Sequence, residues 1–335
     1  MSPVSGETLD MVDKSAEVTE AEVTNKGRPA ERGPAPLAAP ARPGWAALAA
    51  AGVTVVLWAS AFVAIRSAGA AFSPGALALG RLACGSVALG AVCCARREGW
   101  PRRAAWPGIV TSGLLWSGVY MVSLNWGERK VDAGTAAMVV SLGPVVIALV
   151  STWVLKEGLS ATLLAGLVVS FAGVVVVGAA TSEAGHASVA GVMLCLLAAL
   201  SFAVAVVAQK PALRHASALQ VTTFGVAIGA LACLPFTGQL VSEVAAAPLS
   251  ATLKVCYLGA FPTAIGFTTW AYALARTPAG KMGATTYLVP ALTVVMSWAL
   301  LGQVPGLLVI GGGVLCLAGV AIARRRPRPS VPRLG

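Results

Sequence analysis

Two segments of the chain, GERKVDAGTAAMVVSLGPVV at residues 127–146 and ALARTPAGKMGATTYLVPAL at residues 273–292, resemble each other at a separation of 146 residues. The same separation continues into the next apolar run of each segment. Identical residues align at Ala133-Gly134 with Ala279-Gly280, Leu142 with Leu288, Pro144 with Pro290, and Ala172-Gly173-Val174 with Ala318-Gly319-Val320. One offset over two consecutive apolar runs predicts an internal repeat.

The composition predicts an integral membrane protein. Of 335 residues, 57% are hydrophobic and 11% are charged, with a mean hydropathy of +0.81, whereas soluble domains carry about 25% charged residues. Apolar runs long enough to cross about 30 Å of hydrocarbon as helices recur along the chain. They lie near 44–65, 73–95, 104–126, 134–155, 160–180, 190–208, 218–238, 253–274, 282–301 and 305–322.

The repeat and these ten runs together predict an all-α fold of two five-helix units, over 44–180 and 190–322. Because five is odd, the second unit must enter the membrane in the opposite orientation. Such inverted-topology repeats are a recurring plan of secondary transporters, with the substrate site between the two units.

Charge distribution predicts the orientation of the helices. The net charge is +11, but the basic residues lie in short clusters between apolar runs, so we expect no nucleic-acid partner. If the N-terminus is cytoplasmic, the inner loops and the C-terminal tail hold fourteen Lys and Arg residues and the outer loops hold four, as the positive-inside rule requires. Residues 1–43, which lack a signal-peptide layout, are expected to be a disordered cytoplasmic tail, and 323–335 a basic cytoplasmic tail.

Signals for an enzyme or a metal centre are missing from the sequence. The seven cysteines lie in apolar runs without metal-site or redox spacing, and neither GxSxG nor HExxH occurs. The GGG at residues 311–313 lies inside an apolar run and indicates helix packing. We therefore expect no cofactor, no metal and no catalytic residue.

Pro144 and Pro290 fall within apolar runs, at equivalent positions of the repeat. A proline in a helix interior lacks the N–H and displaces the carbonyl four residues earlier, which predicts a helix kink at each. These kinks either line a cavity and bend between states, or are static and improve packing.

Arg81 is the charged residue well inside a predicted span. An intramembrane charge suggests a functional site. Two interpretations stay open. The guanidinium either faces a cavity, where it would bind a carboxylate or phosphate, or extends along the helix to the outer headgroups.

Polar and aromatic residues near helix ends are further candidates for a substrate cavity. Aromatic residues at these positions are also typical membrane-interface anchors, so both interpretations are open. The candidates are Trp58 and Ser60 in the first span, Asn125 and Trp126 at the end of the third, and Trp270 and Tyr272 at the end of the eighth.

Acidic residues bear on energy coupling. The six outside the N-terminal tail all fall in expected loops: Glu98, Glu128, Asp132, Glu157, Glu183 and Glu243. Proton-coupled export of cationic drugs requires an intramembrane carboxylate. We therefore expect facilitated diffusion, or coupling through the ionisation of the substrate, and a solvated Glu157.

The segments WASAFVAIRSA (58–68), DAGTAAMVVSLGPVVIALVSTWVLKEGLS (132–160) and TWAYALARTPAGKMGATTYLVPALTVVMSWALLGQVPG (269–306) resemble EamA-type transporters of the drug/metabolite transporter superfamily. The resemblance covers about 44–322. It implies ten helices in two repeats, export of small metabolites or drugs, and a cavity lined by the first, third, fourth, sixth, eighth and ninth helices. Gln303 departs from the family, which often has Glu there.

These observations predict a multi-pass secondary transporter of the cytoplasmic membrane that exports small metabolites, such as amino acids, by alternating access. Multidrug efflux is the alternative within transport, and a membrane enzyme or receptor is the alternative from another class. The expected partners are a small-molecule substrate, the lipid bilayer and a second copy of the chain in a homodimer.

Overall fold

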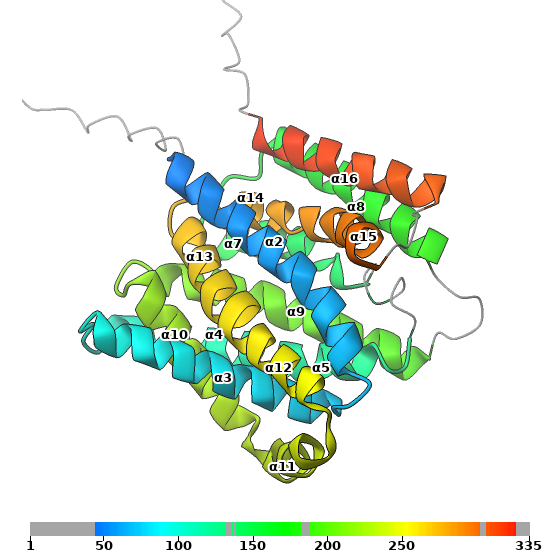
Figure 1. The fold of residues 1–335 in the computed structure, drawn as a ribbon. Helices are drawn as coiled ribbons and strands as arrows, with labels where there is room; N and C mark the ends of the chain where they lie inside the picture. Colours follow the sequence, from blue (N-terminus) through cyan, green and yellow to red (C-terminus); the bar gives the residue numbers. More distant parts are fainter. Residues whose placement is uncertain (1–43, 132–135, 137–138, 182–187, 302–305, 326–335) are drawn as a thin grey trace, which may run out of the picture. The chain divides into compact units, whose positions relative to one another are not determined.

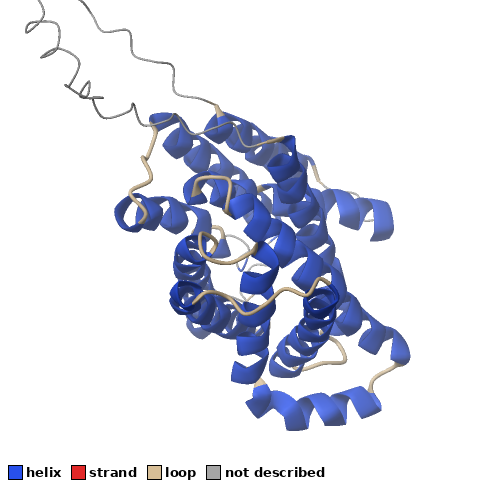
Figure 2. Cartoon of the chain, turned by 90° about the vertical axis from the view of Figure 1, so that its left-hand side faces the viewer, coloured by secondary structure: helices blue, strands red, loops and turns tan. Residues whose placement is uncertain are grey.

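The structure is a computed structural model that describes residues 44–131, 136, 139–181, 188–301 and 306–325 (Figure 1). Every regular element in these ranges is a helix, and Figure 2 shows no strand among them. The apolar runs form these helices because a chain in lipid must satisfy its backbone hydrogen bonds internally.

Six helical segments are long and apolar enough to cross a membrane. They comprise α2 (Trp45–Ala68), α3 (Pro74–Ala95), the run η1–α4–η2–α5 (Arg103–Ala105, Trp106–Ser112, Gly113–Tyr120, Met121–Gly127), α8 (Ala161–Thr181), α9 (Val189–Ala212) and α16 (Leu307–Arg324). A seventh candidate joins α10 (Ala218–Ala232) to η3 (Leu234–Phe236) and α11 (Thr237–Ala246), with a bend of 53°. The chain is therefore a multi-pass helical membrane protein.

The other expected spans are shorter or interrupted in the described ranges. They correspond to α7 (Gly143–Val154), to α12, η4 and α13 (Leu249–Leu258, Gly259–Ile265, Gly266–Leu274), and to α14 and α15 (Ala279–Thr285, Leu288–Leu301). The seventh span expected over 218–238 is bent rather than continuous, because the chain turns at a 3-10 segment that contains Pro235. A proline cannot continue the preceding hydrogen-bond ladder.

The two repeat-related prolines do not lie inside continuous helices, which corrects that prediction. Pro144 is the second residue of α7 and Pro290 the third of α15, and each helix follows a turn, at residues 141–142 and 286–287. The first turn of a helix has N–H groups without intrahelical partners, so a proline costs nothing there. The chain is interrupted before each proline rather than kinked at it. Ala133-Gly134 and Gln303 lie outside the described residues.

Two π-helical segments occupy equivalent places in the runs α4–η2–α5 and α12–η4–α13. The segment η2 begins at Gly113 and η4 begins at Gly259, 146 residues later. In η4 the wide turn accommodates Pro262, which lacks a backbone donor. Such π segments are rare and occur frequently at functional sites.

The helices α8 and α16 lie side by side along their length (Figure 1). A Cβ on Gly173 would lie 2.6 Å from the carbonyl oxygen of Gly312, and a Cβ on Gly312 would lie 2.7 Å from that of Gly173. Gly166 meets Gly319 in the same manner. Small residues allow such close approach of backbones in membranes. Because the partner number falls from Gly319 to Gly312 as α8 runs from Gly166 to Gly173, the helices are antiparallel.

Polar contacts in the same region join positions that are 146 residues apart. The Ser170 hydroxyl donates to the Cys316 carbonyl at 3.2 Å, and the Cys316 thiol donates to the Ser170 carbonyl at 3.6 Å. The Tyr287 hydroxyl donates to the Ser141 carbonyl at 2.8 Å. Residues that the sequence repeat makes equivalent therefore contact each other directly.

Candidate substrate site

Six aromatic side chains from α2, η2, α9 and α13 pack together in the largest buried cluster. They are Trp58, Trp116, Tyr120, Phe202, Phe267 and Trp270. The centroids of Trp58 and Trp270 are 5.1 Å apart in a stacked pair, and Trp116 stacks on Phe267 at 4.5 Å. The rings therefore fill the space between α2, η2, α9 and α13.

The two stacked tryptophans carry unused hydrogen-bond donors. The Nε1 atoms of Trp58 and Trp270 are buried, and neither has a hydrogen-bond partner among the described residues. A buried indole N–H normally has a partner. The pair combines flat apolar surface with two donors, which suits an amphipathic ligand.

Arg81 is buried in α3, with 5% of its surface exposed, so it does not extend to the headgroups. Its Nε atom donates to the hydroxyl of Thr263 at 2.9 Å, and Thr263 lies in η4. The two Nη atoms have no hydrogen bond to any described residue. The far edge of the guanidinium is therefore available for a ligand.

The guanidinium lies close to the aromatic cluster. Thr263 and Phe267 are four residues apart in the eighth span, so they lie on one face of the helix. The hydrogen bond from Arg81 to Thr263 thus connects the guanidinium to the helical run that carries Phe267 and Trp270.

A small void lies beside this region, between η2, α9 and α10. It measures about 10 Å³, and its lining includes Ser117, Gln209 and Thr222. The Oε1 atom of Gln209 is buried without a hydrogen-bond partner in the described structure. A space of this size holds about one water molecule, so a substrate requires the surrounding helices to separate.

Two of the predicted site residues have local partners. The hydroxyl of Ser60 is 2.7 Å from that of Tyr257 and donates to the Leu57 carbonyl. The Asn125 amide donates to the Pro74 carbonyl at 3.1 Å and so joins the third span to the start of α3. These contacts join α2 to α12 and α5 to α3.

The repeat-related aromatic residues Trp126 and Tyr272 lie apart from the cluster. Trp126 is 42% exposed and meets Phe236 edge-on at 6.0 Å. Tyr272 lies under the Arg276 guanidinium, whose carbon is 3.6 Å from the ring centroid. Both positions fit the interface-anchor interpretation.

The sequence of this chain matches the EamA-like transporter family twice, over residues 45–179 and 189–325. The chain belongs to the EamA-like transporter family. Its members are transporters, so the predicted family and the predicted transporter function are confirmed.

Named relatives of this EamA-like transporter include exporters. A "probable terminal-alkyne amino-acid exporter" of Streptantibioticus cattleyicolor is 37% identical over 82% of this chain and 92% of its own. A "probable amino-acid metabolite efflux pump" of Salmonella typhimurium is 25% identical over 57% of this chain and 67% of its own. A solved crystal structure is similar in fold, with a TM-score of 0.68 and 24% identity over 84% of this chain and 97% of that one.

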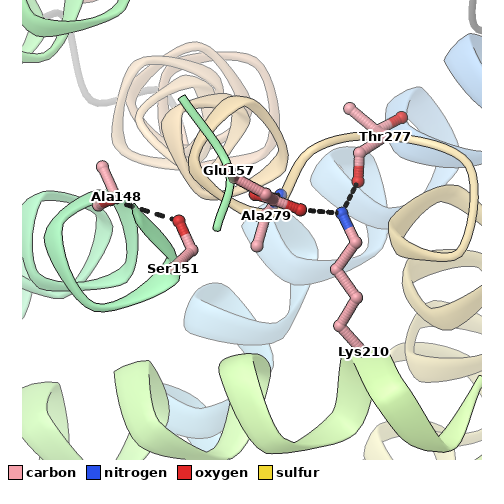
Figure 3. A network of polar contacts seen from close by, with 6 residues as sticks. All are labelled: Ala148, Ser151, Glu157, Lys210, Thr277 and Ala279. Atoms are coloured by element: carbon pink, nitrogen blue, oxygen red, sulfur yellow. Dashed lines mark hydrogen bonds and ion pairs between the residues drawn. The ribbon is translucent and has the colours of Figure 1, made fainter. Parts of the chain in front are cut away.

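The carboxylate of Glu157 differs from the sequence prediction, which had it solvated. It is 18% exposed and forms an ion pair with Lys210 of α9 (Figure 3). The backbone N–H of Ala279 also donates to Glu157, at 2.6 Å. Charge alternation along the chain gave no signal of this pair, because its members are separated by 53 residues.

Glu128 is another residue that sequence reasoning assigned to a loop only. It caps the C-terminus of α5, directly after the third span. The side chain is half-buried, and burial raises the pKa of its carboxyl to about 7. Desolvation disfavours the charged form of a carboxyl. Burial directly after the third span therefore disfavours the charged form of this carboxyl.

Proposed function

We propose that this EamA-like transporter exports small metabolites with a carboxylate group, such as amino acids and their relatives, across the cytoplasmic membrane by alternating access. The observation that carries the substrate class is Arg81. Its guanidinium is buried, donates from Nε to Thr263, and makes no hydrogen bond from either Nη atom to a described residue.

A carboxylate satisfies this arrangement. Removing a charged group from water costs several kcal/mol unless the group is paired. Two parallel N–H groups of an arginine match the two oxygens of a carboxylate. The stacked Trp58 and Trp270 would cover the apolar part of the same ligand.

The printed names of two relatives support this substrate class, since both refer to amino acids or their metabolites. A permanently cationic drug would instead meet the positive charge of Arg81. Multidrug efflux of cations is therefore the weaker candidate.

For the architecture we propose ten spans in two inverted repeats over 44–180 and 190–322. Three features support it: the double family match, the π segments 146 residues apart, and the antiparallel contact of α8 with α16. A two-fold axis between the repeats brings equivalent residues together where it passes, as Ser170 and Cys316 are. For the orientation we propose cytoplasmic termini, in line with the Lys and Arg distribution.

The test is flux of labelled amino acids in proteoliposomes that contain wild type, Arg81→Lys or Arg81→Gln. We expect Arg81→Gln to lower flux about ten- to a hundredfold, because it removes a charge-assisted pair of hydrogen bonds. Arg81→Lys should keep the charge but lose the two-pronged geometry, and give an intermediate flux.

The matched control is Arg103→Gln, which removes an exposed arginine outside the site. Its flux should equal that of wild type. Normal carboxylate transport by a folded Arg81→Gln protein would contradict the proposed site. Transport of cationic dyes but of no amino acid would favour multidrug efflux.

A further inference from the structure

A compact polar network joins three segments at one end of the bundle (Figure 3). The ammonium group of Lys210, in the last turn of α9, contacts the Glu157 carboxylate and donates to the Thr277 carbonyl at 2.6 Å. The other Glu157 oxygen accepts from the backbone N–H of Ala279, the first residue of α14. Both oxygens of the carboxylate are therefore occupied.

The local fold explains why Glu157 reaches these partners. The helix α7 ends at Val154, and Lys156 adopts a left-handed backbone conformation with φ of 54°. The Glu157 N–H then donates back to the Ser151 carbonyl at 3.3 Å. This tight turn directs the carboxylate toward α9 and α14 instead of toward solvent.

The network crosses between the two halves of the chain. Glu157 belongs to the first repeat, and its two partners, Lys210 and Ala279, belong to the second. The partners lie where α9 ends and where α13 passes into α14. Separation of the halves at this end must break the ion pair and the backbone contact together.

The ion pair and its hydrogen bonds are strong because their charged groups are shielded from water. The side chains of Lys210 and Glu157 are 14% and 18% exposed. Hydrogen bonds with charged partners are stronger than neutral ones, and removing one member leaves the other charge partly buried and unpaired.

We propose that Glu157 and Lys210 form a latch that keeps the cytoplasmic end of this transporter closed, and that the latch opens each time a substrate enters from that side. This inference rests on the proposed alternating access and orientation. The residues are positioning residues, since they hold helices and do not contact the substrate.

The repeat places the charged residues of this latch at one end of the bundle only. At an offset of 146 residues, Glu157 corresponds to Gln303 and Lys210 to Ala64, and neither carries a charge. The same ion pair therefore cannot form from the equivalent positions of the other end. We infer that the resting state is closed toward the cytoplasm, and that breaking the latch increases the inward-open population.

The experiment compares hydrogen–deuterium exchange of the full-length protein in lipid nanodiscs for wild type, Glu157→Gln, Lys210→Met and Lys210→Arg. We expect about tenfold faster exchange in peptides that cover residues 155–160 and 275–283 for Glu157→Gln and Lys210→Met, because a charged hydrogen-bonded pair is lost. Lys210→Arg keeps the donors and the charge, so its exchange should stay near that of wild type.

The matched control is Arg276→Gln. Arg276 belongs to the same loop but is exposed and contacts only Tyr272 in the described structure. Unchanged local exchange in folded Glu157→Gln and Lys210→Met proteins would overturn the latch. Faster exchange along the whole chain with a lower melting temperature would also overturn it, since the ion pair would then stabilise the whole fold rather than one end.

The outcome is separable from the substrate proposal. Exchange is measured without substrate, so the latch can fail while Arg81→Gln still abolishes flux. Conversely, Arg81→Gln should leave the exchange of residues 155–160 and 275–283 unchanged even if the predicted substrate class is wrong.

Discussion

Ionisable residues at similar places in the sequence of this transporter have different surroundings in the fold. Arg81 is inside a span and finds a hydroxyl from another helix. Glu157 follows a helix and finds a cation. Glu128 also follows a helix, but it is half-buried and burial raises its pKa to about 7. Its environment therefore penalises the charged form.

The raised pKa of Glu128 predicts a pH-dependent stability. A folded-state pKa above the unfolded value means that the folded protein binds the proton more tightly. Stability should then fall as pH rises from the ordinary value of about 4.5 to about 7 and stay constant above it. Glu128→Gln removes this loss, so its melting temperature should match wild type near pH 4 and exceed it at pH 8.

The expected gain at pH 8 is about 1 kcal/mol, less than the whole shift implies because the side chain is partly solvated. Thermal unfolding of detergent-solubilised wild type and variant, measured from pH 4 to pH 8, provides the comparison. A difference between the two proteins that does not change with pH would argue against a raised pKa.

At the scale of elements, close helix contacts decide which small residues are essential. The run Gly311-Gly312-Gly313 lies on α16 and shows three different surroundings. A Cβ on Gly312 would press on the Gly173 carbonyl at 2.7 Å, whereas a Cβ on Gly311 meets nothing within 4 Å. The predicted packing role of this run therefore belongs to its middle residue.

Adjacent glycines thus provide a matched pair of variants. Gly312→Ala should destabilise the protein by about 1–3 kcal/mol, because the α8 backbone must move to admit the methyl group. Gly311→Ala should be neutral or slightly stabilising, because alanine is the better helix former. Fluorescence-detected melting of both purified variants distinguishes them. Equal melting temperatures would mean that α8 and α16 are not packed as described.

The interruptions before Pro144 and Pro290 show where the helices tolerate a proline. The sequence indicated a disturbance at both sites, and the helices do break there. The placement of the prolines in first turns follows from which N–H groups are already unpaired. A flux role for these breaks remains a prediction.

At the scale of the whole bundle, one surface region joins two loops that the sequence assigned to the same side. A cavity of about 450 Å³ is lined by Trp100, Arg102, Arg214 and His215 together with Ala216, Ser217 and Gln220. The loop after α3 and the loop after α9 thus lie together, as a shared membrane side requires. The positive-inside rule assigns this side to the cytoplasm.

Accessibility in intact cells checks this orientation. Cysteines introduced by Ala104→Cys and His215→Cys should be shielded from a membrane-impermeant maleimide and react only after permeabilisation. A cysteine introduced by His186→Cys, in the segment between α8 and α9, should react in intact cells. Wild type, with its native thiols, supplies the background. Labelling of the Ala104→Cys protein before permeabilisation would contradict cytoplasmic termini.

Composition, apolar run length and the 146-residue repeat were sufficient to predict a helical membrane transporter and six of its spans, and the resemblance of three segments predicted its family. These properties can be predicted from local sequence, because the cost of burying backbone in lipid depends on the length and polarity of each segment. Ten spans, and their inversion, stay predictions. Two of the candidate residues, Trp58 and Trp270, meet in one stacked pair.

Partners and surroundings required the folded arrangement. Arg81 binds Thr263 across 182 positions, and Glu157 binds Lys210 across 53. Trp126 and Tyr272 are aromatic residues of predicted spans, as Trp58 and Trp270 are. Unlike that pair, they lie outside the aromatic cluster. Periodicity says that a residue is buried or exposed, but not which side chain from another helix faces it. That choice depends on how the helices cross, and it determines whether a charge is solvated, paired or left open for a ligand.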